Sequence, residues 1–361
     1  MEPFQYISQA NRVIFGQGKR NLAKEELVHL GIKKAIVIAT PQQVELANEI
    51  GEVIGELCGY IYTDAVQHVP IETVKDAQSI VEKLNIDGLV TVGGGSSIGL
   101  AKAIALNTSL PILAIPTTYA GSEMTPVWGI TENNIKKTGT NIVVKPKAVI
   151  YDPDLTITLP QNFAVTSGMN AIAHCAEGLY AENANPIISL FAEEGVRALS
   201  NSLPKIIENP DDMDARSEAQ YGTMLGGMVL GSVGMALHHK LCHTLGGTFN
   251  LPHAETHTVI LPYAIQYNAE HAPRAIKALA RALQTTEKDV PGALFDLAHS
   301  LGINMSLKDL GMKESDLNQA AELATKNPYY NPRPVNKEGI QELLQLAYQG
   351  KRPVTGMISA T

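Results

Sequence analysis

Five of the ten histidines in this chain of 361 residues fall between residues 238 and 257. His239 and His243 are four residues apart, so a helix would place both side chains on one face. A neutral imidazole binds transition metals and also carries protons near neutral pH. We interpret this stretch as a reaction centre. The alternative is a set of helix-end and core histidines that are satisfied by hydrogen bonds.

Two further candidate side chains lie upstream, where His174 follows Asn170 by four residues. With His239 and His253 they would form a set of three imidazoles and one amide. Divalent transition metals favour three imidazoles with a carboxylate, whereas an amide is neutral and a weaker donor. We therefore expect no bound metal, and a metal-free polar cage in its place. The alternative is that Asn170 and His174 only cap a helix or pack in a core.

A glycine-rich segment follows the apolar run 89–92 and precedes an apolar helical pattern. Glycines at the start of a helix let the backbone approach a phosphate, and the free amides and dipole of the helix favour the anion. We predict that Gly94, Gly95 and Ser96 bind the pyrophosphate of a dinucleotide. The segment departs from the strict dinucleotide fingerprint, because Ile98 stands where the last glycine would be. The alternative is a plain tight turn.

Hydroxyl side chains follow two other apolar runs, 35–39 and 112–115. Ligands of open parallel sheets collect at the carboxyl ends of the strands. We assign Thr117, Thr118 and Ser122 to the ribose or the nicotinamide amide of a cofactor, and we count Thr40 as a further cofactor contact. Helix capping is the alternative role for these residues, and the two roles are compatible.

Four short apolar runs occupy the first part of the chain: residues 35–39, 89–92, 112–115 and 148–151. Apolar strands that alternate with helices predict a parallel sheet covered on both faces. The polar segment 131–139 predicts a hairpin or a surface loop.

After about residue 155 the sequence contains no clear strand-like run and becomes rich in Ala, Leu, Met and Glu with helical spacing. The prolines expected to break this pattern are Pro160, Pro186, Pro204, Pro252, Pro262 and Pro273. We expect a last short helix at about residues 337–348. The prediction is a Rossmann-like α/β nucleotide-binding domain at residues 1–155 and an all-α substrate and catalytic domain at residues 156–361.

The chain is acidic overall, with 36 Asp and Glu against 28 Lys and Arg and a net charge of −8. This balance argues against nucleic acid or an anionic membrane as a partner, and no apolar run is long enough to span a bilayer. The three cysteines have no paired spacing, which fits a reducing compartment. Together with an N-terminus that lacks a signal-like pattern, these features lead us to expect a cytoplasmic protein.

Several motifs together resemble those of the iron-containing alcohol dehydrogenase superfamily, and within it the maleylacetate reductase branch. They are the segments Phe15–Gly18, Gly93–Ser96, Pro116–Glu123, Met169–His174, His238–Gly247 and Leu251–His257. The glycine segment is common to the superfamily, and the last two segments are specific to the branch. The resemblance extends from Phe4 to at least Tyr267.

The resemblance implies that NADH or NADPH reduces the carbon–carbon double bond of maleylacetate, which gives 3-oxoadipate in the degradation of aromatic compounds. His174, His239 and His253 match metal-ligand positions of metal-dependent members, and Asn170 replaces their aspartate. His243 or His253 would donate to the enolate and supply the proton of the reduction.

Further implications concern the substrate, the cofactor and the assembly. Lys240 would bind one carboxylate of a small dianionic substrate, although an exposed lysine is the default alternative. Pro41 stands where NAD-preferring relatives have an acidic residue, so nothing repels a 2′-phosphate and both cofactors are expected to work. The family suggests a homodimer.

Three other functions remain open. A metal-dependent alcohol or aldehyde dehydrogenase of the same family would tolerate Asn170 as a ligand. A lyase similar to dehydroquinate synthase would use NAD transiently and depend on metal, which the missing carboxylate argues against. A non-catalytic nucleotide-binding or assembly protein would have no need of the histidine cluster.

Overall fold

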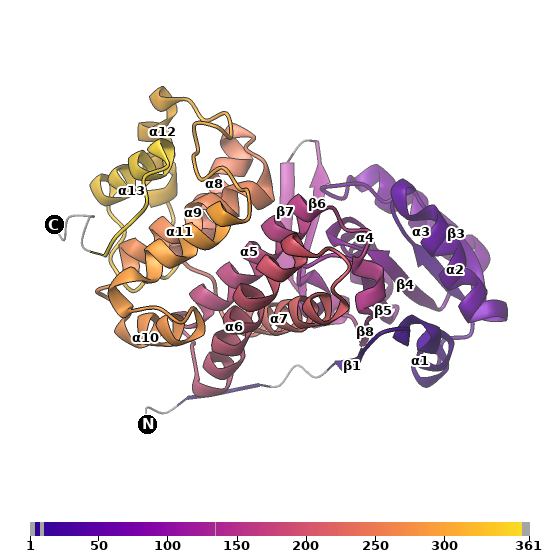
Figure 1. The fold of residues 1–361 in the computed structure, drawn as a ribbon. Helices are drawn as coiled ribbons and strands as arrows, with labels where there is room; N and C mark the ends of the chain where they lie inside the picture. The colour runs from indigo at the N-terminus through magenta and orange to yellow at the C-terminus, as the bar shows by residue number, and fades with distance from the viewer. Residues whose placement is uncertain (1–3, 8–10, 134, 356–361) are drawn as a thin grey trace. The chain divides into compact units, whose positions relative to one another are not determined.

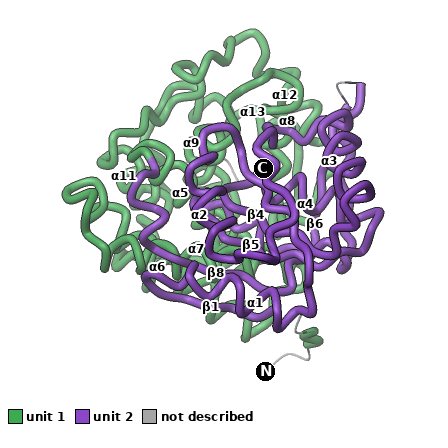
Figure 2. The backbone as a smooth tube through the Cα atoms, turned by 90° about the vertical axis from the view of Figure 1, so that its right-hand side faces the viewer, with its two compact units in different colours: residues 1–7, 160–361 green, residues 8–159 purple. Residues whose placement is uncertain are grey.

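The structure is a computed structural model that describes residues 4–7, 11–133 and 135–355. The chain forms two compact units (Figure 2), and we call them the sheet unit and the helical unit. The sheet unit holds residues 8–159. The helical unit holds residues 160–361 together with the N-terminal segment that ends at Ile7.

Six parallel strands form the centre of the sheet unit, in the order β1-β8-β5-β4-β2-β3. They are β1 (Arg12–Phe15), β2 (Ala35–Ile38), β3 (Cys58–Tyr62), β4 (Gly88–Gly93), β5 (Ile112–Pro116) and β8 (Ala148–Tyr151). The four predicted runs correspond to β2, β4, β5 and β8, which confirms the parallel sheet. The sequence did not reveal β1 and β3, because these edge strands are largely half-buried or exposed and lack a continuous apolar run.

Helices cover both faces of this sheet (Figure 1). They are α1 (Ala23–His29), α2 (Val44–Ile54), α3 (Ile71–Leu84) and α4 (Gly95–Thr108). Val37 and Val90 share one apolar core with α1 and α2, whereas Ile36 and Leu89 share another with α3 and α4. Neighbouring residues of one strand point to opposite faces, so the continuous apolar runs reflect burial on both sides.

A two-stranded antiparallel hairpin follows β5. Its strands are β6 (Val127–Glu132) and β7 (Ile135–Thr140). The predicted hairpin at residues 131–139 is therefore confirmed, although it begins earlier than expected. Asn134, which stands between the two strands in the sequence, lies outside the described residues.

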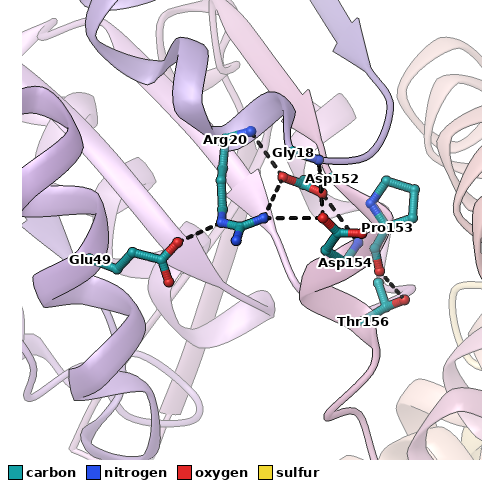
Figure 3. A network of polar contacts seen from close by, with 7 residues as sticks. All are labelled: Gly18, Arg20, Glu49, Asp152, Pro153, Asp154 and Thr156. Carbon is teal, nitrogen blue, oxygen red and sulfur yellow. Dashed lines mark hydrogen bonds and ion pairs between the residues drawn. The ribbon is translucent and has the colours of Figure 1, made fainter. Parts of the chain in front are cut away.

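A buried carboxylate joins the loop after β1 to the end of β8 (Figure 3). Asp152 is fully buried and accepts hydrogen bonds from the backbone amides of Gly18 and Arg20, each at 3.0 Å. The Arg20 guanidinium also donates to Asp152 at 3.1 Å. These contacts hold the turn that follows β8 within the sheet unit, so the two units divide at Leu159 and Pro160 rather than at residue 155.

Only helices and short helical turns occur in the helical unit where the structure describes it, in agreement with the predicted all-α domain. The helices are α5 (Gln161–Gly178), α6 (Pro186–Glu208), α7 (Met213–Ser232), α8 (Leu237–Phe249), α9 (His253–Asn268), α10 (Pro273–Ala282), α11 (Val290–Ser300), α12 (Leu317–Thr325) and α13 (Lys337–Gln349). Helix α9 is buried without interruption from Thr256 to Asn268, and α5, α8, α11 and α13 all contact it. It is therefore the core helix of this unit.

Two of the predicted helix breaks are wrong, because Pro204 lies inside α6 and Pro262 lies inside α9. A proline removes one helix hydrogen bond and clashes with the preceding turn. Burial of long helices against their neighbours compensates for that loss here. The prolines that do stand at helix starts are Pro160, Pro186, Pro252 and Pro273.

Among the residues that the structure describes, no helix combines the length and the apolar character that crossing a membrane requires.

Candidate active site

Three helices of the helical unit carry the clustered side chains. Helix α5 carries Asn170 and His174, α8 carries His238, His239 and His243, and α9 carries His253 and His257. Since α5 and α8 both pack against α9, histidines that are far apart in the sequence meet around the core helix.

His257 lies at the centre of this histidine cluster. Its ring centroid is 4.3 Å from that of His253, 4.9 Å from that of His238 and 5.1 Å from that of His239. On the other side of the cluster, the rings of His174 and His239 stack with their centroids 5.2 Å apart. The upstream and downstream motifs of the sequence therefore form one group.

The predicted pairing of His239 and His243 on one helix face is confirmed. Both lie on α8, and their ring centroids are 6.1 Å apart. His239 is 4% exposed, whereas His243 is exposed to solvent. The pair thus reaches from the buried part of the cluster to the surface of the unit.

Burial divides the histidines into two groups. The buried ones are His174, His238, His239 and His257. Desolvation is the largest cause that lowers their pKa values, and it lowers the pKa of His238 to about 4. They are therefore neutral near pH 7. The exposed ones are His243 and His253.

Hydrogen bonds fix the proton on two of the buried rings. Nε2 of His238 lies 2.8 Å from the carbonyl oxygen of His257, and Nδ1 of His239 lies 2.7 Å from Oε2 of Glu177. A carbonyl and a carboxylate only accept, so each of these nitrogens carries the hydrogen. The other nitrogen of each neutral ring then holds a lone pair.

Several polar atoms of the cluster are buried and have no partner among the described residues. They are Asn170 Oδ1, His174 Nδ1, His239 Nε2 and both ring nitrogens of His257. Buried polar groups are almost always paired, so a group of unpaired ones needs an explanation. A bound ligand that interacts with these atoms supplies one.

The ring nitrogens of His238, His239 and His257 come within 4.8 Å of one another, which makes these residues a further candidate set of metal ligands. Two of those rings already use one nitrogen each in the hydrogen bonds to Glu177 and to the His257 carbonyl. One lone pair remains on each of these rings, which is all that a metal ligand uses. The set contains no carboxylate to balance the charge of a metal.

Tyr329 contacts two candidates on α8, the exposed His243 and the half-buried Lys240. Its hydroxyl lies 3.2 Å from Nδ1 of His243. Nζ of Lys240 lies over its ring, 5.7 Å from the centroid, which is within the range of a cation–π interaction. Lys240 is therefore held beside His243, and its role toward a substrate carboxylate stays a prediction.

Sequence reasoning missed Glu177 and Tyr329. Glu177 follows His174 by three residues on α5, a spacing that places both on one helix face. That spacing could have identified Glu177 as a neighbour of the histidines. Tyr329 stands 86 positions from His243, and no local pattern connects them.

In the sheet unit, the glycine segment joins β4 to α4 as predicted. Gly93 ends β4 with a φ of 134°, and Gly94 is the N-cap of α4. A Cβ on Gly93 would collide with Gln43, and a Cβ on Gly94 would lie 2.9 Å from Thr118. A Cβ on Gly95 would meet nothing within 4 Å beyond its own neighbours among the described residues. The first two glycines serve the packing of the loop, and the third leaves open space at a helix start that suits a phosphate.

The position of this loop in the sheet also suits a ligand. β2 and β4 are neighbours, but the helices that follow them, α2 and α4, pack on opposite faces of the sheet. Open parallel sheets bind ligands at the carboxyl ends of such a strand pair. Thr40 follows β2 and makes no side-chain cap, so its hydroxyl is not used by the helical turn that it begins.

Two hydroxyls assigned to the cofactor are held by side chains that the sequence did not single out. Oγ1 of Thr117 accepts a hydrogen bond from Gln43 Nε2 at 2.7 Å. Nζ of the buried Lys102 donates to the Ser122 carbonyl oxygen at 2.6 Å and lies 3.2 Å from its hydroxyl. Both hydroxyls keep a hydrogen to donate. The assignment of these residues, of Thr118 and of Ser96 to a cofactor stays a prediction.

Comparison with known protein families agrees with this architecture. Residues 10–153 match the family described as iron-containing alcohol dehydrogenase, and residues 164–348 match the C-terminal part of the Fe-containing alcohol dehydrogenase family.

Individual relatives cover almost the whole chain. A maleylacetate reductase of Pseudomonas sp. (strain P51) is 54% identical over 343 residues, which is 95% of this chain and 97% of the relative. A maleylacetate reductase of Sphingobium indicum is 50% identical over 352 residues, with 98% and 99% covered. The crystal structure of maleylacetate reductase from Agrobacterium tumefaciens has a TM-score of 0.95 at 46% identity and covers 98% of this chain and 100% of its own. This chain therefore belongs to the iron-containing alcohol dehydrogenase family.

Proposed function

We propose that this protein is an oxidoreductase that uses NADH or NADPH to reduce the carbon–carbon double bond of maleylacetate, which gives 3-oxoadipate. One observation carries the proposal. A largely buried histidine cluster has Asn170 in place of a metal-ligand aspartate, in a chain that is 54% identical to a maleylacetate reductase. We place this reaction in the breakdown of aromatic compounds.

The described residues fit a dinucleotide. The space above Gly95 and the start of α4, which has no acidic residue in its first turn, would accept the pyrophosphate. Thr117 and Ser122 would donate to the nicotinamide end. Pro41 follows β2 where an acidic residue would select against a 2′-phosphate, which supports the use of both cofactors.

The family name implies a metal, and the donor set decides how well one would fit. Asn170 Oδ1, His174, His239 Nε2 and His253 would be its ligands, and the first three positions include buried atoms without a partner among the described residues. All four donors are neutral, so the charge that a carboxylate ligand provides is missing. The set fits a divalent metal in number but not in charge, and we propose that the reaction needs none.

The chemistry of the substrate explains why the reaction would need no metal. When bound, a reduced nicotinamide supplies a hydride to the alkene carbon that is β to the ketone. The ketone oxygen then becomes an enolate, and the α carbon must gain a proton. Hydrogen-bond donors that face the enolate stabilise it. Because the double bond is conjugated to the ketone, no strong Lewis acid is required to activate it.

The donors that we assign to these steps are the exposed His243 and His253. His239 carries its hydrogen on Nδ1 toward Glu177, so its Nε2 accepts rather than donates. Lys240, held over the Tyr329 ring, would bind one carboxylate of the dianionic substrate.

We further propose a cytoplasmic homodimer that binds neither nucleic acid nor membrane. The balance of 36 acidic against 28 basic residues supports the absence of nucleic-acid and membrane partners, and three cysteines without disulfides support the compartment. The homodimer rests on the family resemblance alone. Light scattering coupled to gel filtration tests the assembly.

A cofactor-oxidation assay tests the function. The purified protein is given maleylacetate with NADH or with NADPH, each with and without a chelator, and its metal content is measured. We expect both cofactors to be oxidised, with no effect of the chelator. Activity on simple aldehydes or alcohols that the chelator abolishes would instead identify a metal-dependent alcohol or aldehyde dehydrogenase.

A further inference from the structure

Glu177 is a fully buried carboxylate at the end of α5, and it contacts the start of α8. Its Oε1 accepts from the backbone amide of His238 at 2.6 Å, and its Oε2 accepts from that of Ala236 at 2.9 Å. The amide of His239 lies 3.4 Å from Oε2, and Nδ1 of the same residue lies 2.7 Å from it. Three of these four contacts come from backbone amides, which can only donate.

The ionised form of Glu177 is the one that this environment suits. Burial raises its pKa, but three backbone amides donate to its oxygens, and hydrogen bonds to the charged form of a carboxyl favour that form. Ala236 is the N-cap of α8, and His238 and His239 belong to its first turn, so the carboxylate also faces the positive end of that helix. Ala236 offers no side chain that could serve as a cap, and Glu177 supplies one from another helix.

This arrangement determines where the His239 hydrogen lies. A carboxylate accepts only, so Nδ1 carries the hydrogen and Nε2 of the neutral ring presents a lone pair. Nε2 is buried, has no partner among the described residues, and shares that state with Asn170 Oδ1 and His174 Nδ1. The stacked rings of His174 and His239 place the atoms of these two residues in one group.

We propose that Glu177 is a positioning residue, which holds His239 in the tautomer whose Nε2 accepts a hydrogen bond at the reaction centre. The inference rests on the proposed function for its catalytic consequence. The cluster is divided by role: His239 presents an acceptor atom at the reaction centre, and the donors to the enolate are the exposed His243 and His253. Second-sphere carboxylates fix histidine rings in this way in other enzymes.

The position of the hydrogen can be measured without substrate. Nitrogen NMR of histidine-labelled protein distinguishes the two tautomers, and His239→Asn identifies the signal while keeping an amide donor toward Glu177. We expect the hydrogen on Nδ1 in the unmodified protein. A His239 that carries it on Nε2 overturns the inference, whatever the assay with maleylacetate shows. If His239 has the expected tautomer but the protein does not reduce maleylacetate, the proposed function is wrong and the inference about Glu177 stands.

Variants of Glu177 test the consequence for turnover. Glu177→Met removes every acceptor, and Glu177→Gln keeps one oxygen for His239. We expect Glu177→Met to lower kcat by about tenfold or more with the KM for NADH within about twofold, and Glu177→Gln to recover part of the loss. An unchanged kcat in folded Glu177→Met contradicts the proposal. If that variant does not fold, the NMR measurement on the unmodified protein decides.

A matched control separates positioning from a general loosening of α8. Asn183 accepts a hydrogen bond from Gly234 at 2.9 Å and donates to Ser232, so it supports the loop that leads into α8. Asn183→Ala should lower the melting temperature but leave kcat and the His239 tautomer unchanged. If Asn183→Ala lowered kcat as much as Glu177→Met does, at the same loss of stability, Glu177 would have only a structural role.

Discussion

The hydroxyl oxygen of Tyr329 lies 3.2 Å from Nδ1 of His243, although the two residues stand 86 positions apart. His243 is exposed, and this contact connects its ring to the segment that carries Tyr329. The contact holds that ring in one orientation. A proton donor must be oriented toward its target to work efficiently, and Tyr329 therefore supports the role that we assign to His243.

Removal of the His243 imidazole should affect the chemistry more than the binding of cofactor. We expect His243→Ala to lower kcat by about 10²- to 10⁴-fold, the usual contribution of a general acid. The dissociation constant of NADH should change by less than about twofold. Steady-state kinetics and cofactor titration measure the two effects. His271→Ala removes an exposed histidine outside the cluster and should change neither. If His243→Ala raises only the KM, the assigned role is wrong.

Loss of the Tyr329 hydroxyl should have a smaller effect of the same kind. Tyr329→Phe removes one hydrogen bond to His243 and keeps the ring that Lys240 covers. We expect kcat to fall by roughly tenfold, which corresponds to about 1.4 kcal/mol, with the KM for maleylacetate unchanged. Tyr329→Ala also removes the cation–π contact, so that KM should rise as well. Identical kinetics for Tyr329→Phe and the unmodified protein would show that the hydroxyl does not orient His243.

The sequence predicted those parts of the fold that local patterns encode. Four central strands are apolar on both faces and so appeared as continuous runs, whereas the edge strands β1 and β3 did not. The sequence predicts a helix break at Pro262, because the local effect of a proline opposes a helix. Its position in the core helix α9 depends on packing, which a single local pattern does not record.

The candidate site shows the same division. The four-residue spacing of His239 and His243 predicted a shared helix face, and the structure confirms it. The polar partners of the site residues come from distant segments: Glu177 reaches α8 from 62 positions away, and Lys102 reaches Ser122 from another helix. Such partners depend on how helices pack, and the residue types alone did not identify them.

Addition of one methyl group should test the phosphate site without harm to the fold. A Cβ at Gly95 meets nothing within 4 Å beyond its neighbours among the described residues, so Gly95→Ala should fold normally. The methyl group would occupy the space proposed for the pyrophosphate, and we expect the dissociation constant of NADH to rise by about tenfold or more. Isothermal titration measures it. Gly247→Ala, on an equally open glycine of α8, is the control and should leave NADH binding unchanged. Equal NADH affinity in both variants would place the phosphate elsewhere.

Restoration of the missing carboxylate should create a metal site. Asn170→Asp adds a charged ligand to three imidazoles, a set that divalent transition metals favour. We expect the variant to retain zinc or iron through desalting and to melt at a higher temperature when metal is added, since a ligand of the folded state stabilises it. Elemental analysis measures retention. Asn162→Asp places the same charge on an exposed part of α5 and should retain none. Equal metal retention by the unmodified protein would contradict the proposed metal-free reaction.

The buried Lys102 should make stability depend on pH above neutrality. Lys102 is 1% exposed, and burial lowers its pKa from the ordinary 10.5 to about 7. Between these values the unfolded chain binds more protons at this residue than the folded chain does. The free energy of unfolding therefore rises with pH through this window, by on the order of 1 kcal/mol per pH unit.

Urea unfolding at about pH 7.5 and about pH 9 measures this effect. Lys102→Met removes the titrating group and leaves the Ser122 and Val127 carbonyl oxygens without their donor, so it should be less stable at both pH values. The informative quantity is the change with pH, which should be smaller in Lys102→Met than in the unmodified protein. If the two proteins gain the same stability between these pH values, Lys102 is protonated throughout. Its ammonium group would then be a permanent charge that the oxygens of Ser122, Thr125 and Val127 hold in the core.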